Sequence, residues 1–182
     1  MRLALDVDGV LADFIWSFSL AATEMGLMEE PFPTTEQEEW DFPINVNPVW
    51  VEVKARWNWW MTLRPLVGVS GVHRLNKAIA AHDVYFITSR PRTLGLSAER
   101  QTHHWLTGIG VQTAHASVIA TKTGTKGALC KALDISIMLD DCPTNLLDLH
   151  EWGVEAVALR QAYNRDWQLA FDNLTDFLEA YA

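Results

Sequence analysis

Two carboxylates close to the N-terminus, Asp6 and Asp8, lie two residues apart and are followed by Gly9. In an extended chain, side chains at positions i and i+2 point to the same side, and glycine lets the backbone turn sharply behind them. A second acidic pair, Asp140 and Asp141, adds more negative charge. Carboxylates this close repel one another, so together they predict a hard divalent cation, and Mg²⁺ is the natural candidate. Taken alone, the first pair and its glycine are equally well explained as an ordinary turn.

Polar and cationic residues further along the chain could serve an anionic ligand. Thr88 and Ser89 offer hydroxyl groups that can hydrogen-bond phosphoryl oxygens, and Arg90 follows them directly. Lys126 could neutralise both phosphate and aspartate charge. Each has an ordinary alternative, since a loop threonine is usually a cap, Arg90 could form a surface salt bridge, and most lysines are solvated. Their meaning depends on whether the fold brings them to the acidic pairs.

Five short apolar segments predict buried strands, because each is a run of five or six mainly aliphatic or β-branched residues. They are Arg2–Asp6, Asp83–Thr88, Ala116–Thr121, Ile135–Asp140 and Val154–Leu159. Segments with apolar residues at helical spacing follow at about 72–79, 98–106, 126–133, 145–152 and 167–181. Strands that alternate with helices predict an α/β fold with a mainly parallel sheet flanked by helices. Ligands bind such sheets outside the carboxyl ends of the strands, where most of these polar residues fall.

The stretch from about residue 14 to residue 65 interrupts this alternation. It is too long for one crossover helix, and it contains several prolines, an acidic run at 36–41 and six of the nine tryptophans. We predict a small, mostly helical cap formed by residues 14–65, over a core formed by residues 1–13 and 66–182. Trp57, Trp59 and Trp60 are expected to pack inside the cap, because each indole buries a large area.

Charge and composition exclude several functional classes for this protein. The chain of 182 residues has a formal charge of −9, which argues against a protein that coats duplex nucleic acid. No apolar run reaches the ~18 residues of a membrane span, and acidic residues interrupt the N-terminal segment that could pass for a signal peptide. Cys130 and Cys142 are expected to be buried free thiols. We expect a cytoplasmic protein without a membrane partner.

Together these features resemble the haloacid dehalogenase superfamily of phosphohydrolases. The four motifs of that superfamily correspond to Asp6–Val10, Phe86–Arg90, Lys126 and Met138–Asn145. Within it, the opening Asp6-Val-Asp-Gly-Val-Leu-Ala-Asp-Phe is similar to that of the 5′(3′)-deoxyribonucleotidases. The resemblance covers about residues 1–14 and 66–160, whereas the 14–65 stretch matches only in position, size and aromatic content. It implies a Rossmann-like core with a small helical cap after the first strand.

The resemblance also implies roles for the acidic residues. Asp6 would be the nucleophile that forms an aspartyl phosphate, and Asp8 would be the general acid and base. Mg²⁺ would bind the Asp6 carboxylate, the backbone carbonyl of Asp8 and Asp141. Asp140 would orient the metal ligands or the motif lysine.

The phosphoryl group would be contacted by Thr88, Ser89 and Arg90. The motif lysine has two candidates, because in the deoxyribonucleotidases it lies closer to the acidic pair, without an intervening helix. Lys122 and Lys126 compete for this role. We favour Lys126, which would begin a helix at the ligand face of the sheet.

The substrate implied by the resemblance is a small phosphomonoester, with a deoxyribonucleoside 5′-monophosphate as the first expectation. Phe14 would pack on the base, and Trp40 could do the same, since base–aromatic stacking tolerates any base. Sugar phosphates and polynucleotide ends remain alternative substrates, and a non-catalytic nucleotide-binding module remains an alternative function. A homodimer is compatible with the sequence, which does not fix the oligomeric state.

Overall fold

The computed structural model describes residues 1–182 and contains one six-stranded parallel sheet with strand order β3-β2-β1-β4-β5-β6. The strands are β1 (Arg2–Leu5), β2 (Asp83–Thr88), β3 (Ala116–Ala120), β4 (Ile137–Asp140), β5 (Glu155–Leu159) and β6 (Ala170–Phe171). The predicted α/β fold is therefore confirmed. Each of the five predicted strands is present within two residues of its expected ends.

Seven α-helices complete the fold. They are α1 (Phe14–Glu24), α2 (Asn47–Ala55), α3 (Val69–Ala81), α4 (Ala98–Gly108), α5 (Lys126–Ala132), α6 (Pro143–Glu151) and α7 (Leu174–Tyr181). Short 3₁₀ turns lie at η1 (Thr34–Glu36), η2 (Trp59–Met61), η3 (Thr113–His115) and η4 (Ala162–Asn164). None of the helices is long and apolar enough to cross a membrane.

Successive side chains along the strands point to alternate faces of the sheet and so divide the core between the two faces. Leu3 and Leu5 of β1 pack with apolar residues of α3, α4 and α7, whereas Ala4 packs with residues of α5 and α6. Successive side chains of a strand point to opposite faces, so a parallel sheet covered on both sides requires continuous apolar runs. These runs made the strands recognisable in the sequence.

The C-terminal segment differs from the prediction of one helix over 167–181. Residues 170 and 171 form the edge strand β6, which pairs with β5 through hydrogen bonds from Ala158 N to Leu169 O and from Arg160 N to Phe171 O, both 2.9 Å. Helix α7 begins only after Asn173, whose side chain accepts a hydrogen bond of 3.0 Å from Asp176 N. Sheet pairing and this N-cap together override the apolar spacing that suggested a longer helix.

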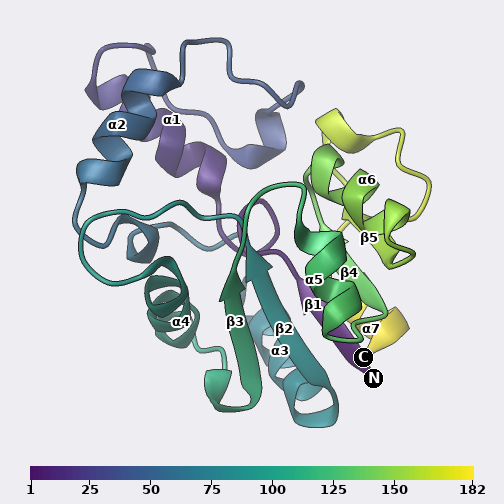
Figure 1. Ribbon diagram of the computed structural model, residues 1–182. Coiled ribbons are helices and arrows are strands. Elements are labelled where there is room, and N and C mark those ends of the chain that lie inside the picture. The colour runs from purple at the N-terminus through teal and green to yellow at the C-terminus, as the bar shows by residue number, and fades with distance from the viewer.

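The stretch from residue 14 to residue 65 contains α1, α2 and two 3₁₀ turns joined by long irregular segments. Figure 1 shows α1 and α2 above the carboxyl ends of the strands, which point towards them. Trp59 and Trp60 are buried in the same apolar cluster as the sheet residues. Trp57, in contrast, is 73% exposed, so the expectation that it packs inside this stretch is wrong.

Asp13 fixes the start of this stretch to two later points of the chain. Its buried carboxylate caps α1 by accepting from Trp16 N at 3.1 Å, and it accepts from the backbone N–H and hydroxyl of Thr34 at 3.1 and 2.7 Å. The guanidinium of Arg64 donates to Oδ2 at 2.6 and 2.9 Å. One carboxylate thus ties together the first helix, the turn η1 and the return to the core.

Asp13→Ala should lower the free energy of unfolding by about 2–4 kcal/mol, because it removes a helix cap and leaves buried donors without an acceptor. Urea denaturation followed by circular dichroism measures this change. Asp83→Ala is the matched control, because Asp83 makes only an exposed ion pair with Arg2 at 3.5 Å and should change stability by less than about 1 kcal/mol. Equal effects of the two substitutions would contradict the role given to Asp13.

Candidate active site

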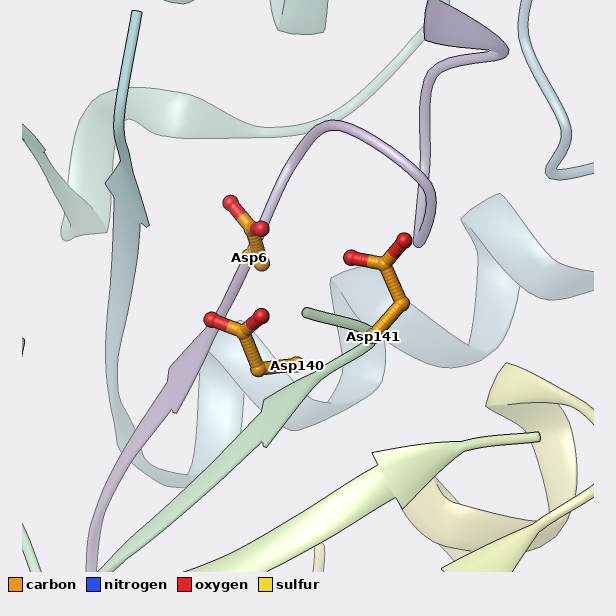
Figure 2. Close-up of side chains that lie close together, drawn as sticks. All are labelled: Asp6, Asp140 and Asp141. Carbon is orange, nitrogen blue, oxygen red and sulfur yellow. The ribbon is translucent and has the colours of Figure 1, made fainter. Parts of the chain in front are cut away.

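Parallel pairing of β1 with β4 brings the acidic residues together at one edge of the sheet. Leu5 is in register with Leu139, and Asp6 N donates to Leu139 O at 2.8 Å. Asp6, Asp140 and Asp141 therefore leave adjacent strand ends, and one carboxylate oxygen of each lies within 4.8 Å of the others. Figure 2 shows the three carboxylates facing a common space. All three residues are buried, so this group could hold a metal ion.

Lys126, the first residue of α5, lies against this acidic group. Its Nζ is 3.0 Å from Asp6 Oδ1 and 2.7 Å from Asp140 Oδ2, and its side chain is fully buried. Burial by itself lowers the pKa of Lys126, but the attraction of the Asp140 and Asp6 carboxylates outweighs it and raises that pKa above the ordinary value. Of the two candidate lysines, the structure brings Lys126 to the acidic residues and leaves Lys122 exposed.

Asp140 has its oxygens fully occupied by the protein. Besides Lys126, it accepts from Cys142 N at 2.9 Å and from the Asn145 amide at 3.2 Å to both oxygens. Asn145 in turn accepts from Gly124 N at 3.0 Å, which fixes the loop before Lys126. Asp140 is thus placed to orient the lysine, whereas Asp6 and Asp141 keep oxygens available for a cation.

Asp141 is held between the N-terminal turn and the loop after β5. The Tyr163 hydroxyl donates to its Oδ2, and the Asn164 amide donates to its backbone carbonyl at 2.9 Å. On the other side, Gly9 has a φ of +76°, and a Cβ at this position would lie 1.9 Å from Asp141 Oδ2. Glycine is required here because any larger residue would displace the carboxylate.

Asp8 points away from this group and binds Arg90. The guanidinium donates from Nη2 to Oδ1 at 2.8 Å and from Nε to Oδ2 at 2.9 Å, and the Thr88 hydroxyl donates to Oδ2 at 3.1 Å. The third nitrogen of Arg90 donates to Thr102 at 2.9 Å, and the guanidinium lies 4.8 Å from the centre of the Trp60 ring.

These contacts change the roles predicted from the sequence. Arg90 is buried with all its nitrogens bound, so we correct its expected role from a phosphate contact to a partner of Asp8. The Thr88 hydroxyl also donates to Asp8, so it does not face an open position where a phosphoryl group could bind. Ser89, in contrast, has a buried hydroxyl with no hydrogen-bond partner, and it lines the adjacent cavity.

This cavity of about 240 Å³ has an acidic and an aromatic side. Asp6, Asp8 and Asp141 belong to its acidic lining, and the aromatic lining is Phe14, Phe18, Trp40, Phe42, Trp50 and Trp60, with one further carboxylate at Asp41. Phe14 is half-buried, and its ring centre lies 5.8 Å from that of Trp50. Trp40 is 42% exposed and packs edge-on against Tyr163 with ring centres 5.3 Å apart. No lysine or arginine lines the cavity.

Negative charge exceeds positive charge around the acidic residues. Asp6, Asp8, Asp140 and Asp141 are opposed by only two close cations, Lys126 and Arg90. Burial and then the neighbouring carboxylates raise the pKa of Asp6 well above its ordinary value, and burial and Asp140 raise that of Asp141 to about 7. An excess of two carboxylates with free oxygens matches the charge and the ligand preference of a divalent cation such as Mg²⁺. The residues present therefore fit this ion.

Tyr163 and Asn164 were missed in the sequence. They lie in the short turn η4, which has neither apolar periodicity nor a motif around it. The only local signal is the pairing of Gln161 with Asn164, which marks a capped turn and says nothing about a site.

Lys126→Met should destabilise the fold by about 3–5 kcal/mol, because it leaves buried carboxylates without their counter-charge. Lys122→Met removes an equal charge from an exposed position and should change stability by less than about 0.5 kcal/mol. Urea denaturation of both variants in metal-free buffer tests the difference. A stable Lys126→Met variant would show that the lysine does not balance this charge.

Comparison of the sequence with protein-family models and with characterised proteins gives no match. Solved structures are similar over nearly the whole chain. A haloacid dehalogenase-like hydrolase from Streptococcus pneumoniae, SP0104, superposes with a TM-score of 0.63 at 11% identity and covers 100% of this chain and 98% of its own. The defluorinating L-2-haloacid dehalogenase Rha0230 gives a TM-score of 0.57 at 9% identity, with 98% and 94% covered. The chain thus has the fold of haloacid dehalogenase-like hydrolases.

Proposed function

We propose that this protein is a Mg²⁺-dependent phosphomonoester hydrolase that acts through an aspartyl phosphate on Asp6, with deoxyribonucleoside 5′-monophosphates as substrates. The observation that carries the proposal is the excess of carboxylates beside a cavity with aromatic lining. A carboxylate nucleophile repels a phosphate dianion unless cations hold both. The site contains that nucleophile and the unbalanced charge that a cation would neutralise.

Asp6 and Asp141, with the backbone carbonyl of Asp8, would hold the Mg²⁺. When bound, the ion would neutralise carboxylate and phosphate charge and polarise the phosphoryl oxygens. Asp140 would keep Lys126 in place beside Asp6. The partnerless hydroxyl of Ser89 is available to donate to a phosphoryl oxygen.

The reaction would proceed in two displacements at phosphorus. The Asp6 carboxylate attacks phosphorus, the bond to the ester oxygen breaks, and Asp8 gives that oxygen a proton. In the second step, Asp8 takes a proton from water, which attacks the aspartyl phosphate and releases inorganic phosphate and the Asp6 carboxylate. Between the two steps, the ion pair with Arg90 would hold the Asp8 carboxylate in place. For the first step, a protonated Asp8 must turn from Arg90 towards the leaving oxygen.

The chemistry of the leaving group is inferred from the other residues that line the cavity. The remaining lining offers aromatic faces, the Asp41 carboxylate and no lysine or arginine. This favours a flat, uncharged leaving group such as a nucleoside over a sugar phosphate or a second phosphate. Displacement of halide from a 2-haloacid is the alternative reaction at a carboxylate nucleophile. The excess of carboxylates, which suits a divalent cation, favours phosphoryl transfer, because that cation would hold the phosphate beside Asp6.

Steady-state hydrolysis of the common 5′- and 3′-mononucleotides, sugar phosphates, a 5′-phosphorylated oligonucleotide and 2-chloropropionate, each with and without Mg²⁺, tests the proposal. We expect Mg²⁺-dependent release of phosphate, fastest from the 5′-deoxyribonucleotides, and none from Asp6→Asn. A preference for sugar phosphates or oligonucleotide ends would change the substrate class. Release of chloride would replace the proposed reaction, and nucleotide binding without turnover would favour a non-catalytic module.

Asp8→Asn should lower turnover by about 10²-fold or more, the usual scale for a lost general acid, because the amide can neither give nor take the proton. Its backbone carbonyl is unchanged, so Mg²⁺ binding, measured by calorimetry, and trapping with fluoroberyllate should persist. Loss of Mg²⁺ binding together with turnover would show that the carboxylate of Asp8 serves the metal instead.

Phe14→Ala should lower the preference for nucleotides over p-nitrophenyl phosphate by about 5- to 150-fold in relative kcat/KM, because one base–aromatic stack contributes about 1–3 kcal/mol. Trp57→Ala is the matched control, since this exposed aromatic of the same stretch does not line the cavity. Equal losses of both substrates in Phe14→Ala would assign Phe14 to packing with Phe18 and Trp50.

A further inference from the structure

We propose that Tyr163 is a positioning residue that connects the cation site to the mouth of the cavity, with its hydroxyl orienting Asp141 and its ring contacting Trp40. The inference rests on the proposed function in taking Asp141 as a ligand of the divalent cation. It adds a residue outside the four motifs and a physical link between the cation and the stretch 14–65.

The hydroxyl of Tyr163 selects one orientation of the Asp141 carboxylate. It donates to Oδ2, whereas Oδ1 receives no hydrogen bond from the protein, and Asp141 lines the cavity. Gly9 packs against the same carboxylate so closely that a Cβ at this position would lie 1.9 Å from Oδ2. A carboxylate held by this contact and by the hydrogen bond presents its free oxygen in a fixed direction, which is how outer hydrogen bonds orient metal ligands.

The turn that carries Tyr163 is itself held rigidly. Asn164 donates to Asp141 O and to Leu159 O, both at 2.9 Å, so the turn is bound to the ends of β4 and β5. Within the turn, Gln161 N donates to Asn164 Oδ1 at 2.8 Å. The backbone that carries the aromatic ring is therefore held in place. We expect a shift of Asp141 to move the ring as well.

The ring of Tyr163 meets the stretch 14–65 at Trp40. The two ring centres lie 5.3 Å apart with an interplanar angle of 69°, an edge-to-face contact. Trp40 lines the cavity, and its backbone carbonyl accepts from the Gln37 side chain at 2.9 Å. Since coupling between two sites is reciprocal, a cation at Asp141 should alter the surroundings of Trp40, and a ligand beside Trp40 should alter cation affinity.

Tyr163→Phe keeps the ring and removes only the hydroxyl. Calorimetric titration with Mg²⁺ should give a Kd about 10-fold weaker than that of the wild type, within the 10–100-fold range for lost outer hydrogen bonds to metal ligands. Tyr181→Phe is the matched control, because it removes a hydroxyl that donates to the Glu155 carboxylate at 2.7 Å on the exposed surface. Its Mg²⁺ affinity should equal that of the wild type.

Fluorine NMR of protein labelled with 5-fluorotryptophan tests the link to Trp40 without any turnover. The Trp40→Phe variant identifies the Trp40 resonance by its disappearance. This resonance should shift on Mg²⁺ addition in the wild type and in Tyr181→Phe, and should stay in place in Tyr163→Phe at equal saturation with Mg²⁺.

The inference would be overturned if Tyr163→Phe bound Mg²⁺ as tightly as the wild type. It would also be overturned if the Trp40 resonance of the wild type did not shift on Mg²⁺ addition. Either result could occur in a protein that hydrolyses nucleotides, so the proposed function would stand. If the wild type bound no Mg²⁺ at all, both would fail. Should Tyr163→Phe not fold, a wild-type Trp40 resonance that does not shift with Mg²⁺ would still overturn the inference.

Discussion

Three buried carboxylates and the half-buried Asp8, opposed by two cations, form the constraint on which the rest of this structure depends. Parallel pairing of β1 with β4 forces the two acidic segments to end side by side, and burial denies their charges the screening of water. Lys126 is consequently confined between Asp6 and Asp140, and Arg90 is paired with Asp8. The two cations order the carboxylates without neutralising them, and the remaining negative charge makes this edge of the sheet suitable for a divalent cation.

Trp60 connects this electrostatic centre to the stretch that covers it. Its ring lies over the Arg90 guanidinium, lines the cavity, and donates from Nε1 to Pro91 O at 2.9 Å. The same indole therefore supports the partner of Asp8 and the aromatic wall on which a leaving group would rest. Asp13 likewise links the stretch 14–65 to the core, because its carboxylate binds both the start of α1 and the side chain of Arg64. Cavity shape and the position of Asp8 are thus set by shared side chains.

Much of the fold was predictable from the sequence because buried parallel strands are continuous apolar runs, and their polar ends reveal where a ligand binds. Asp6 and the Asp140–Asp141 pair could be assigned to one edge for this reason. The partner of Arg90 could not be predicted, because the sequence shows that this residue is charged but not that it is buried beside Trp60 and Trp105. Strand β6 was missed because two residues carry no periodicity, and Tyr163 because a loop hydroxyl reaches Asp141 only through the three-dimensional fold.

Thermal unfolding in the presence of Mg²⁺ tests most directly whether the excess carboxylate charge is a cation site. A ligand that binds only the folded state stabilises it by about 2.7 kcal/mol at a hundredfold excess over its Kd. At constant ionic strength and pH 7.5, Tm of the wild type should rise by several degrees with millimolar Mg²⁺, and Tm of Asp141→Asn should not. A wild-type Tm that ignores Mg²⁺, or an equal rise in both proteins, would contradict the account.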